Sequence, residues 1–294
     1  EMTSSLVGSE MCIRDSQYGQ DVDGVIGIDP GFLQYLLGLV GNVSLPDGTV
    51  VDGTNAAKVL MHDVYWNYPV EESDGIFASV ASAAFDKVLG GIGDVDVTKL
   101  VSAVERGAEE GRLIAWMRND DEQNAIKETG IDASLPDPDD PSADPVAGVY
   151  FNNLSFSKLD WYLNADTQIG QGVKNGDGTC SYRITVTLTN IMTQEEAGKL
   201  PDYVAASAPD AARDDERLNV SLFAPTGGNI SDLTVEGTQF GLGAATWHGI
   251  PFYSGTVDLH AGETTPITYT LTPSAEAGDK PLTLRQTPTC LLYT

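Results

Sequence analysis

The feature that most constrains the fold of this sequence is a change in the spacing of its apolar residues. Up to about residue 128, apolar side chains recur every three to four positions, the spacing that places them on one face of a helix. After Cys180 they alternate, and Tyr182, Ile184, Val186 and Leu188 fall on one side of a strand. Since one backbone conformation does not satisfy both spacings, we predict an α+β protein with a helix-rich first part and a β second part.

The first part has the pattern of an α/β domain. Residues 22–29 form a short β-branched run typical of a buried strand, and Pro30 stands where it can open a helix. Gly41 ends that helix, and Pro46-Asp47-Gly48 predicts the turn of a hairpin over residues 42–51. Helical spacing then predicts helices over residues 54–68 (capped by Thr54), 73–89, 96–117 and 120–128.

A segment rich in proline and aspartate, residues 135–145, interrupts this pattern. It holds four prolines and four aspartates, which neither a helix nor a central strand accommodates, so we predict a linker or long loop. A strand over 146–151 and a short helix over 155–163 follow, and we expect both to belong to the first domain. The α/β domain is therefore expected to span residues 17–170.

The second domain, residues 171–289, consists of short strands between turn residues. About seven strands over this length favour a β-sandwich of immunoglobulin-like type. Asn175-Gly176-Asp177-Gly178 predicts a tight hairpin turn within it. The strands that follow the alternating run after Cys180 are predicted over residues 218–223, 233–236, 244–248, 252–259, 266–271 and 282–286.

Both ends of the chain resemble translated sequencing-adapter peptides. The resemblance covers residues 1–16 and 290–294, and segments of this kind are set aside before a fold is considered. Cys12 and Cys290 then drop out and Cys180 stands alone, so we expect neither a disulfide framework nor a cysteine metal motif. The lack of a signal peptide or membrane anchor at the start then carries no information.

The charge balance excludes one class of function. The chain has 16 Lys and Arg residues against 43 Asp and Glu residues, a formal net charge of −27. Nucleic-acid binding depends on clustered basic side chains that displace counterions, so nucleic acid is excluded as a partner and anionic membrane surfaces are disfavoured. The same charge suits an extracytoplasmic protein, and 41% apolar residues suffice for a sizeable core.

Catalytic and metal-binding signatures are absent from the sequence. It contains no G-x-S-x-G elbow, no H-E-x-x-H, no Walker loop and no complete G-x-G-x-x-G. The three histidines, His62, His248 and His260, are dispersed. The D-x-D pairs, such as Asp94-Val95-Asp96, are better explained by capping and solubility than by a divalent metal. We therefore predict no cofactor and no metal site.

Four segments together resemble one family. They are residues 18–30 (YGQDVDGVIGIDP), 43–48 (VSLPDG), 109–113 (EEGRL) and 157–163 (SKLDWYL). In these segments the chain resembles the domain-of-unknown-function 4012 family of actinobacterial envelope proteins, and the resemblance covers nearly all of residues 17–289. It implies an extracytoplasmic body that a membrane helix, upstream of this sequence, anchors in the full-length protein.

The stretch from Asp23 to Tyr68 also resembles, more distantly, the LytR-CpsA-Psr family, which transfers lipid-linked glycopolymers to the cell wall. Arginines around a pyrophosphate do the chemistry in that family, because they neutralise charge on the transferring phosphoryl group. Aligning Asp74 with the family's aspartate puts Tyr65, Asn67 and Phe77 where arginines are expected. The resemblance implies a related scaffold whose chemistry is lost or altered.

Acidic residues occupy the corresponding stretch here. Asp63, Glu71, Glu72 and Asp74 would meet a polyprenyl pyrophosphate with like charge. Asp63 and Asp74 are the candidate binding residues, and no residue is a candidate for catalysis.

Three hypotheses for function follow. The first is a non-catalytic, extracytoplasmic cell-envelope protein whose β-sandwich contacts wall glycopolymers or other envelope proteins. The second is a divergent phosphotransferase in which Asp74 keeps a role and a metal replaces the arginines. The third is a glycan-binding sandwich on a stalk domain, with Trp247, Phe252 and Tyr253 as its platform, although a hydrophobic core is the commoner place for such aromatic side chains.

Overall fold

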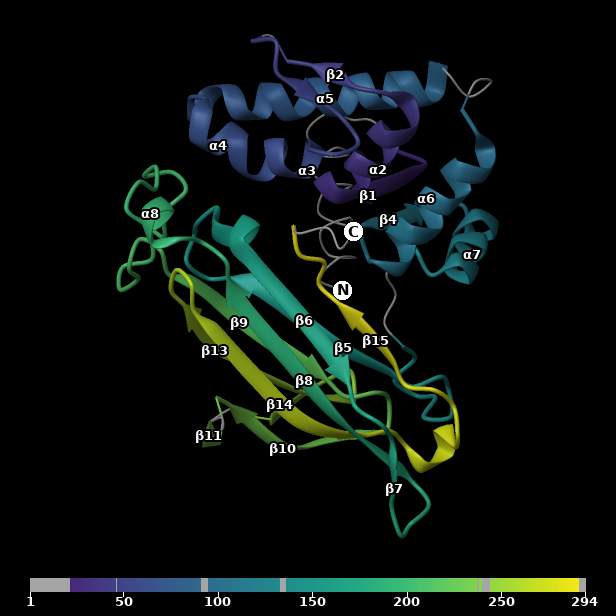
Figure 1. Ribbon diagram of the computed structural model, residues 1–294. Helices are drawn as coiled ribbons and strands as arrows, with labels where there is room; N and C mark the ends of the chain where they lie inside the picture. The colour runs from purple at the N-terminus through teal and green to yellow at the C-terminus, as the bar shows by residue number, and fades with distance from the viewer. Residues whose placement is uncertain are drawn as a thin grey trace. The chain divides into compact units, whose positions relative to one another are not determined.

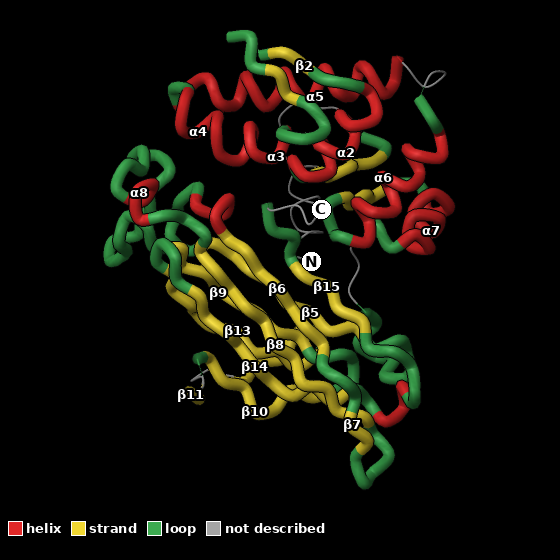
Figure 2. The backbone as a smooth tube through the Cα atoms, in the orientation of Figure 1, coloured by secondary structure: helices red, strands yellow, loops and turns green. Residues whose placement is uncertain are grey.

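The computed structural model describes residues 22–45, 47–90, 95–132, 136–236, 238–239 and 244–290. Helices and strands both contribute, which confirms the α+β class (Figure 1). The chain divides into two compact units. The first unit comprises Glu1–Val64 and Tyr68–Leu135, and the second comprises Tyr65–Asn67 and Pro136–Thr294. Figure 2 shows most of the helical residues in the first unit and most of the strand residues in the second.

The first unit begins with the predicted strand, helix and hairpin. Strand β1 (Gly24–Ile28) leads into helix α2 (Pro30–Val40). Asp29 caps α2, because its carboxylate accepts a hydrogen bond from the Phe32 N–H at 2.7 Å. Gly41 ends the helix with φ 90°, a conformation that glycine adopts without strain. Strands β2 (Val43–Ser44) and β3 (Val50–Val51) pair antiparallel as the predicted hairpin.

The predicted helix over 54–68 is present in three pieces. They are α3 (Ala56–Lys58), the π-helical turn η1 (Val59–Asp63) and α4 (Val64–Asn67), and Asn55, rather than Thr54, precedes the first. Helix α5 (Val70–Gly90) starts earlier than predicted, just after Pro69. These helices pack with α2 and the hairpin around a core that includes Leu33, Leu37, Val51, Leu60, Val64, Ile76 and Val80.

The helix predicted over residues 96–117 is wrong at its C-terminal end. Residues 96–117 form helix α6 (Val97–Glu109) followed by strand β4 (Leu113–Met117), which pairs antiparallel with β1. The break lies at Gly111, whose φ of 69° reverses the chain. Leu113-Ile-Ala-Trp-Met is then a short apolar run, which periodicity alone assigns equally well to a helix or a strand. Asp96 caps α6, and helix α7 (Asp120–Thr129) is confirmed.

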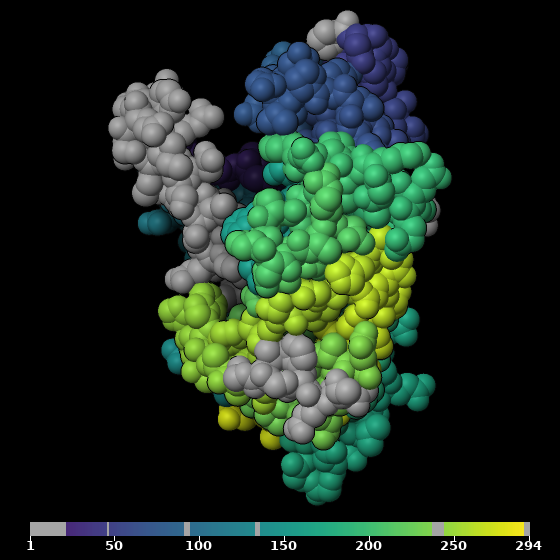
Figure 3. Space-filling view, turned by 90° about the vertical axis from the view of Figure 1, so that its left-hand side faces the viewer, coloured from purple at the N-terminus to yellow at the C-terminus, as the bar shows by residue number. Residues whose placement is uncertain are grey.

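The second unit contains two larger sheets. The first has the strand order β11-β10-β14-β8-β6, with β7 also paired to β8, and the second has the order β12-β13-β9-β5-β15. The hairpin of β7 and β8, in teal, projects from one end of this unit (Figure 3). The strands of the first sheet are β6 (Leu163–Ile169), β7 (Val173–Lys174), β8 (Cys180–Asn190), β10 (Asn229–Val235), β11 (Thr238–Gln239) and β14 (Thr264–Thr272). Those of the second sheet are β5 (Val146–Asn153), β9 (Glu216–Phe223), β12 (Ala244–Trp247), β13 (Ile250–Leu259) and β15 (Thr283–Gln286).

The two sheets share one hydrophobic core. Ile184, Val186 and Leu188 of β8 are buried in it, so the predicted alternation in this strand is confirmed. Leu218, Val220 and Leu222 of β9 line the same core from the other sheet. The turn at Asn175 to Gly178 is also confirmed, since the Asn175 N–H donates to the Thr179 carbonyl at 2.8 Å. An immunoglobulin-like topology stays a prediction.

The division between the units differs from the expected boundary at 170/171. It lies at 135/136, because β5 pairs with β9 and β6 pairs with β8, which puts both strands into the sheets of the second unit. The helix predicted over 155–163 is reduced to the 3₁₀ turn η2 (Leu159–Tyr162), and β6 follows directly. Residues 136–145 contain neither helix nor strand, as predicted for the proline-rich segment.

Two predictions on the ends of the chain fall largely outside the described residues. The adapter-like residues 1–16 and all but Cys290 of 290–294 lie there. Within the described residues, no helix combines the length and the apolar content that crossing a bilayer requires.

Candidate functional site

The predicted binding residues Asp63 and Asp74 lie on different helical segments. Asp63 ends the π-helical turn η1, where Lys58 Nζ lies 2.6 Å and His62 Nδ1 lies 2.7 Å from its carboxylate. Burial alone would raise the pKa of Asp63, but the hydrogen bonds from Lys58 and His62 outweigh it and lower the pKa. Asp74 is exposed on α5, and among the described residues no hydrogen bond or ion pair joins it to Asp63. A site that uses both carboxylates stays a prediction.

A polar network of the first unit joins two segments that are far apart in the sequence. Arg112, only 5% exposed, donates from Nη1 to Asp29 Oδ2 and from Nε to Glu110 Oε2, both at 2.6 Å. Arg106 holds the other oxygen of Glu110 at 2.8 Å and lies over the ring of Tyr35 at 4.3 Å from its centroid. The Asp29-Pro30 and Glu110-Gly111-Arg112 motifs thus meet in one structural ion-pair network.

This network holds its members in fixed protonation states. Tyr35 donates to Glu110 Oε2 at 2.7 Å, and burial together with that bond raises the pKa of Tyr35 to about 12. Burial alone would raise the pKa of Glu110, but hydrogen bonds from Tyr35, Arg106 and Arg112 lower it. Glu110 is therefore a carboxylate at neutral pH, and its charge is matched by the two guanidinium groups.

A second polar group lies at one end of the second unit, where β9 begins. Glu216 is fully buried; its Oε1 accepts a hydrogen bond from Asn153 Nδ2 at 3.4 Å, and its Oε2 has no hydrogen-bond partner among the described residues. Asn153 Nδ2 also lies 3.1 Å from Asp160 Oδ2 and 3.0 Å from Ser157 Oγ. The Asn153 amide is therefore the shared hydrogen-bond donor for two acidic side chains and a hydroxyl.

Burial and like charge keep Glu216 protonated. Burial is the largest cause, and the charges of Asp160 and Asp215 add to it, so that the pKa of Glu216 rises to about 9. Burial also raises the pKa of Asp160, against the hydrogen bond from Asn153. At pH 7 Glu216 is a neutral acid, and a proton rather than a cationic side chain reduces the charge of the pair.

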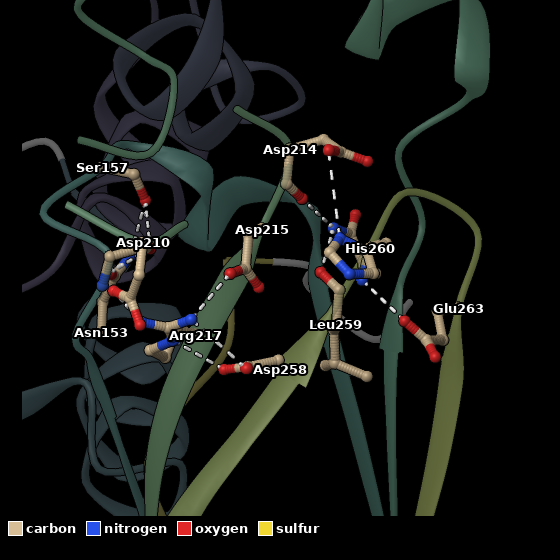
Figure 4. Close-up of polar contacts among 12 residues, drawn as sticks. Asn153, Ser157, Asp210, Asp214, Asp215, Arg217, Asp258, Leu259, His260 and Glu263 are labelled. Carbon is tan, nitrogen blue, oxygen red and sulfur yellow. Dashed lines mark hydrogen bonds and ion pairs between the residues drawn. The ribbon is translucent and has the colours of Figure 1, made fainter. Parts of the chain in front are cut away.

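Arg217, on the other face of β9, is the centre of a group of ion pairs (Figure 4). Arg217 donates to Asp210 at 2.7 Å, to Asp258 at 2.8 Å and to Asp215 at 3.3 Å. Asp215 is 2% exposed, and its Oδ1 has no hydrogen-bond partner among the described residues. Across the described parts of the chain, no group of three or more His, Cys, Asp or Glu side chains is arranged to hold a metal ion.

The three predicted platform aromatics separate between two faces of one sheet. Tyr253 packs against the core, as the commoner interpretation of such residues expects. Trp247 and Phe252 lie instead in a cluster with two rings that the sequence did not single out, Tyr150 and Phe223. We call these four side chains the aromatic patch.

The rings of the aromatic patch contact one another across four neighbouring strands. Phe223 and Phe252 stack with centroids 4.8 Å apart and an interplanar angle of 11°. Tyr150 meets Phe223 edge to face at 5.7 Å, and Trp247 meets it at 6.4 Å. All four rings are partly exposed. Gly148 makes room for Tyr150, because a Cβ at this position would lie 2.6 Å from the tyrosine ring.

The comparison with protein families gives one match. The profile described as a protein of unknown function, DUF4012, matches residues 9–65. This match supports the DUF4012 resemblance over residues 9–65. Among the described residues, this DUF4012 segment contains β1, α2, the β2–β3 hairpin and the helical stretch to Tyr65, including Asp29 and Asp63. The family prediction is thus confirmed over this segment, and the family description gives no activity.

The other comparisons add no functional information. None of the curated proteins matches this chain. A crystal structure of a candidate nutrient binding protein from Legionella pneumophila aligns over 45% of this chain and 45% of that chain, at 10% identity and a TM-score of 0.25. A superposition this loose supports no inference about fold or ligand.

Proposed function

We propose that this chain is a non-catalytic, extracytoplasmic protein of the cell envelope. The main support for the proposal is that Arg112 is buried and already paired with carboxylates. This arginine is 5% exposed and lies between Asp29 and Glu110, so its charge is already neutralised by carboxylates of its own unit. A group that handles pyrophosphate acts by neutralising developing charge on the phosphoryl oxygens, and an arginine engaged in this way does not supply that charge.

The surroundings of the predicted site support the same conclusion. Lys58 is paired with Asp63, and Glu71, Glu72 and Asp74 are exposed acidic side chains on the first turns of α5. A pyrophosphate brought to this surface would meet several carboxylates at once, and like charges a few ångströms apart repel one another. A wall glycopolymer or another envelope protein remains the proposed partner, and the net charge of −27 suits a protein outside the cytoplasm.

Calorimetry with a soluble polyprenyl pyrophosphate distinguishes this proposal from a divergent phosphotransferase. Geranylgeranyl pyrophosphate is titrated into the full chain with and without Mg²⁺. We expect no binding in either case. A phosphotransferase that replaced its arginines with a metal would bind the lipid and Mg²⁺ together, and Asp74→Ala would abolish that binding. Lipid binding that depends on Mg²⁺ and on Asp74 would therefore overturn the proposal.

A charge-reversal double variant tests whether like charge is what excludes pyrophosphate. Asp63→Lys and Asp74→Arg replace two partly or fully exposed carboxylates on the first unit with cations. If like charge is what excludes pyrophosphate, the doubly substituted protein should bind geranylgeranyl pyrophosphate more tightly than the wild-type protein does. Equal absence of binding in both would show that charge is not the deciding factor.

A further inference from the structure

The outward face of the five-stranded sheet is ordered in rows by the strand register. Residues that alternate with the core residues of β5, β9 and β13 point away from the core. In one row Phe252 lies beside Phe223, which lies beside Gly148, and Arg285 of β15 completes the row. Trp247 pairs with Ile250 one row further along, and Tyr150 pairs with Ser221 in the row on the other side. Both rings contact Phe223, and together they complete the aromatic patch.

The next two rows of the same face are polar and uncharged. Beside Tyr150 they hold Ser254, Asn219, Thr256 and Asn152, together with Ser221, which is only 5% exposed. Ser254 donates to Asn219 Oδ1 at 2.8 Å, and its hydroxyl lies 3.0 Å from that of Ser221. These hydroxyl and amide groups can both donate and accept hydrogen bonds.

The charge of this face differs from that of the rest of the chain. The protein carries a net charge of −27, yet the described positions of this face hold one carboxylate, Asp258. Asp258 lies in the row beyond the polar rows and is paired with Arg217 at 2.8 Å. Arg217 and Arg285 are the other charged side chains at the described strand positions of this face. An apolar patch beside a neutral polar strip is therefore present on a strongly acidic protein.

We propose that the aromatic patch and the adjoining polar rows form a binding surface for a neutral glycan chain, an inference that rests on the proposed role in the envelope. Sugar rings present apolar C–H faces, which pack on partly exposed aromatic rings, and hydroxyl groups that both donate and accept hydrogen bonds. Ser254, Asn219 and Asn152 supply partners of this kind beside the patch. The near-neutral charge of the face favours an uncharged ligand over a basic peptide, which would bind to acidic surfaces elsewhere on the chain.

Calorimetry and tryptophan fluorescence with defined oligosaccharides test the surface. Neutral hexasaccharides of glucose, galactose, mannose and N-acetylglucosamine are titrated into the full chain, and oligogalacturonate of equal length serves as the anionic counterpart of the galactose hexamer. We expect at least one neutral hexasaccharide to bind with a Kd below about 1 mM. Where the galactose hexamer is a ligand, the oligogalacturonate should bind at least about tenfold more weakly, because of the acidic charge of the whole chain.

Two substitutions locate the binding on the patch. Trp247→Ala should weaken the affinity by about tenfold or more, equivalent to the loss of one ring contact. Ala245 is exposed and lies directly opposite Phe252, so Ala245→Glu should abolish binding without removing any core side chain. This variant therefore tests the surface even if the Trp247→Ala protein does not fold. Phe156→Ala removes a ring that is 77% exposed elsewhere in the second unit, and it should leave the affinity unchanged.

The outcomes separate this surface from the proposed function. Failure of every neutral hexasaccharide to bind, or unchanged binding in both Trp247→Ala and Ala245→Glu, would overturn the glycan surface. Binding of geranylgeranyl pyrophosphate in the presence of Mg²⁺ would overturn the non-catalytic role and leave the glycan surface standing.

Discussion

Replacing Glu216 with glutamine should change how the stability of the second unit depends on pH. The folded state holds the pKa of Glu216 at about 9, against an ordinary value of 4.5 in an unfolded chain. A group whose pKa is raised by folding contributes fully below the unfolded pKa, and the contribution is lost as pH rises toward the folded pKa. Each pH unit between these values costs about 1.4 kcal/mol, so the unit should lose about 3 kcal/mol between pH 5 and pH 7 from this group.

Glutamine keeps the shape of the neutral acid and its acceptor oxygen toward Asn153, but it does not titrate. In Glu216→Gln we therefore expect most of this pH dependence to disappear, and the variant should be more stable than the wild-type protein at pH 7. Burial also raises the pKa of Asp160, so a smaller slope of the same sign remains. Glu276→Gln, at an exposed position in the short turn η3 (Ala275–Ala277), is the matched control and should keep the wild-type slope.

Hydrogen exchange of the β9 amides, followed by mass spectrometry from pH 5 to pH 8, measures this effect in the second unit alone. Correction for the intrinsic exchange rate gives the free energy of opening at each pH. A wild-type slope in Glu216→Gln, or a wild-type opening free energy that is flat over this range, would show that Glu216 is not held protonated by folding.

Four further substitutions, at three positions, test the packing arguments. Arg112→Met should destabilise the first unit by about 3 kcal/mol in urea denaturation, because it leaves Asp29 and Glu110 without their shared buried cation; a loss below about 1 kcal/mol would show that the network is dispensable. Asp29→Asn should retain the cap of α2 and lose only the ion pair, so Asp29→Ala should cost about 1 kcal/mol more, and equal losses would contradict the separation of the two roles. Tyr269→Phe should raise the stability of the second unit by about 1 kcal/mol, since the tyrosine hydroxyl is buried without a hydrogen-bond partner among the described residues. A lower melting temperature for Tyr269→Phe would mean that the hydroxyl is satisfied.

Much of the fold could be predicted from local patterns. The hydrophobic alternation after Cys180 correctly predicted β8, and Pro30 and Gly41 correctly marked both ends of α2. The errors occur where tertiary pairing decides. Residues 113–117 are a strand because β1 is available to pair with them, and β6 was missed because Leu163-Asn-Ala-Asp-Thr-Gln-Ile shows little strand signal without its partner β8.

The polar groups of the second unit were missed for a related reason. Glu216 lies two and four residues before Leu218 and Val220, so the alternation along β9 puts it on the same, inward side of the strand. The sequence pattern therefore already indicated that this acid is buried. Its neighbour Asp160 lies far away in the sequence, and no pattern brings the two together. The aromatic patch likewise needed the register, because Tyr150, Phe223 and Phe252 come from three strands that only pairing places side by side.

The most direct test of the proposed role is a transfer assay with the intact reaction partners. The purified chain is incubated with a radiolabelled, polyprenyl-pyrophosphate-linked oligosaccharide, cell-wall acceptor and Mg²⁺, and label in the washed wall fraction is counted. We expect no label above the protein-free blank. Transfer that requires both the chain and Mg²⁺, and that is lost in Asp74→Ala, would contradict the proposed role.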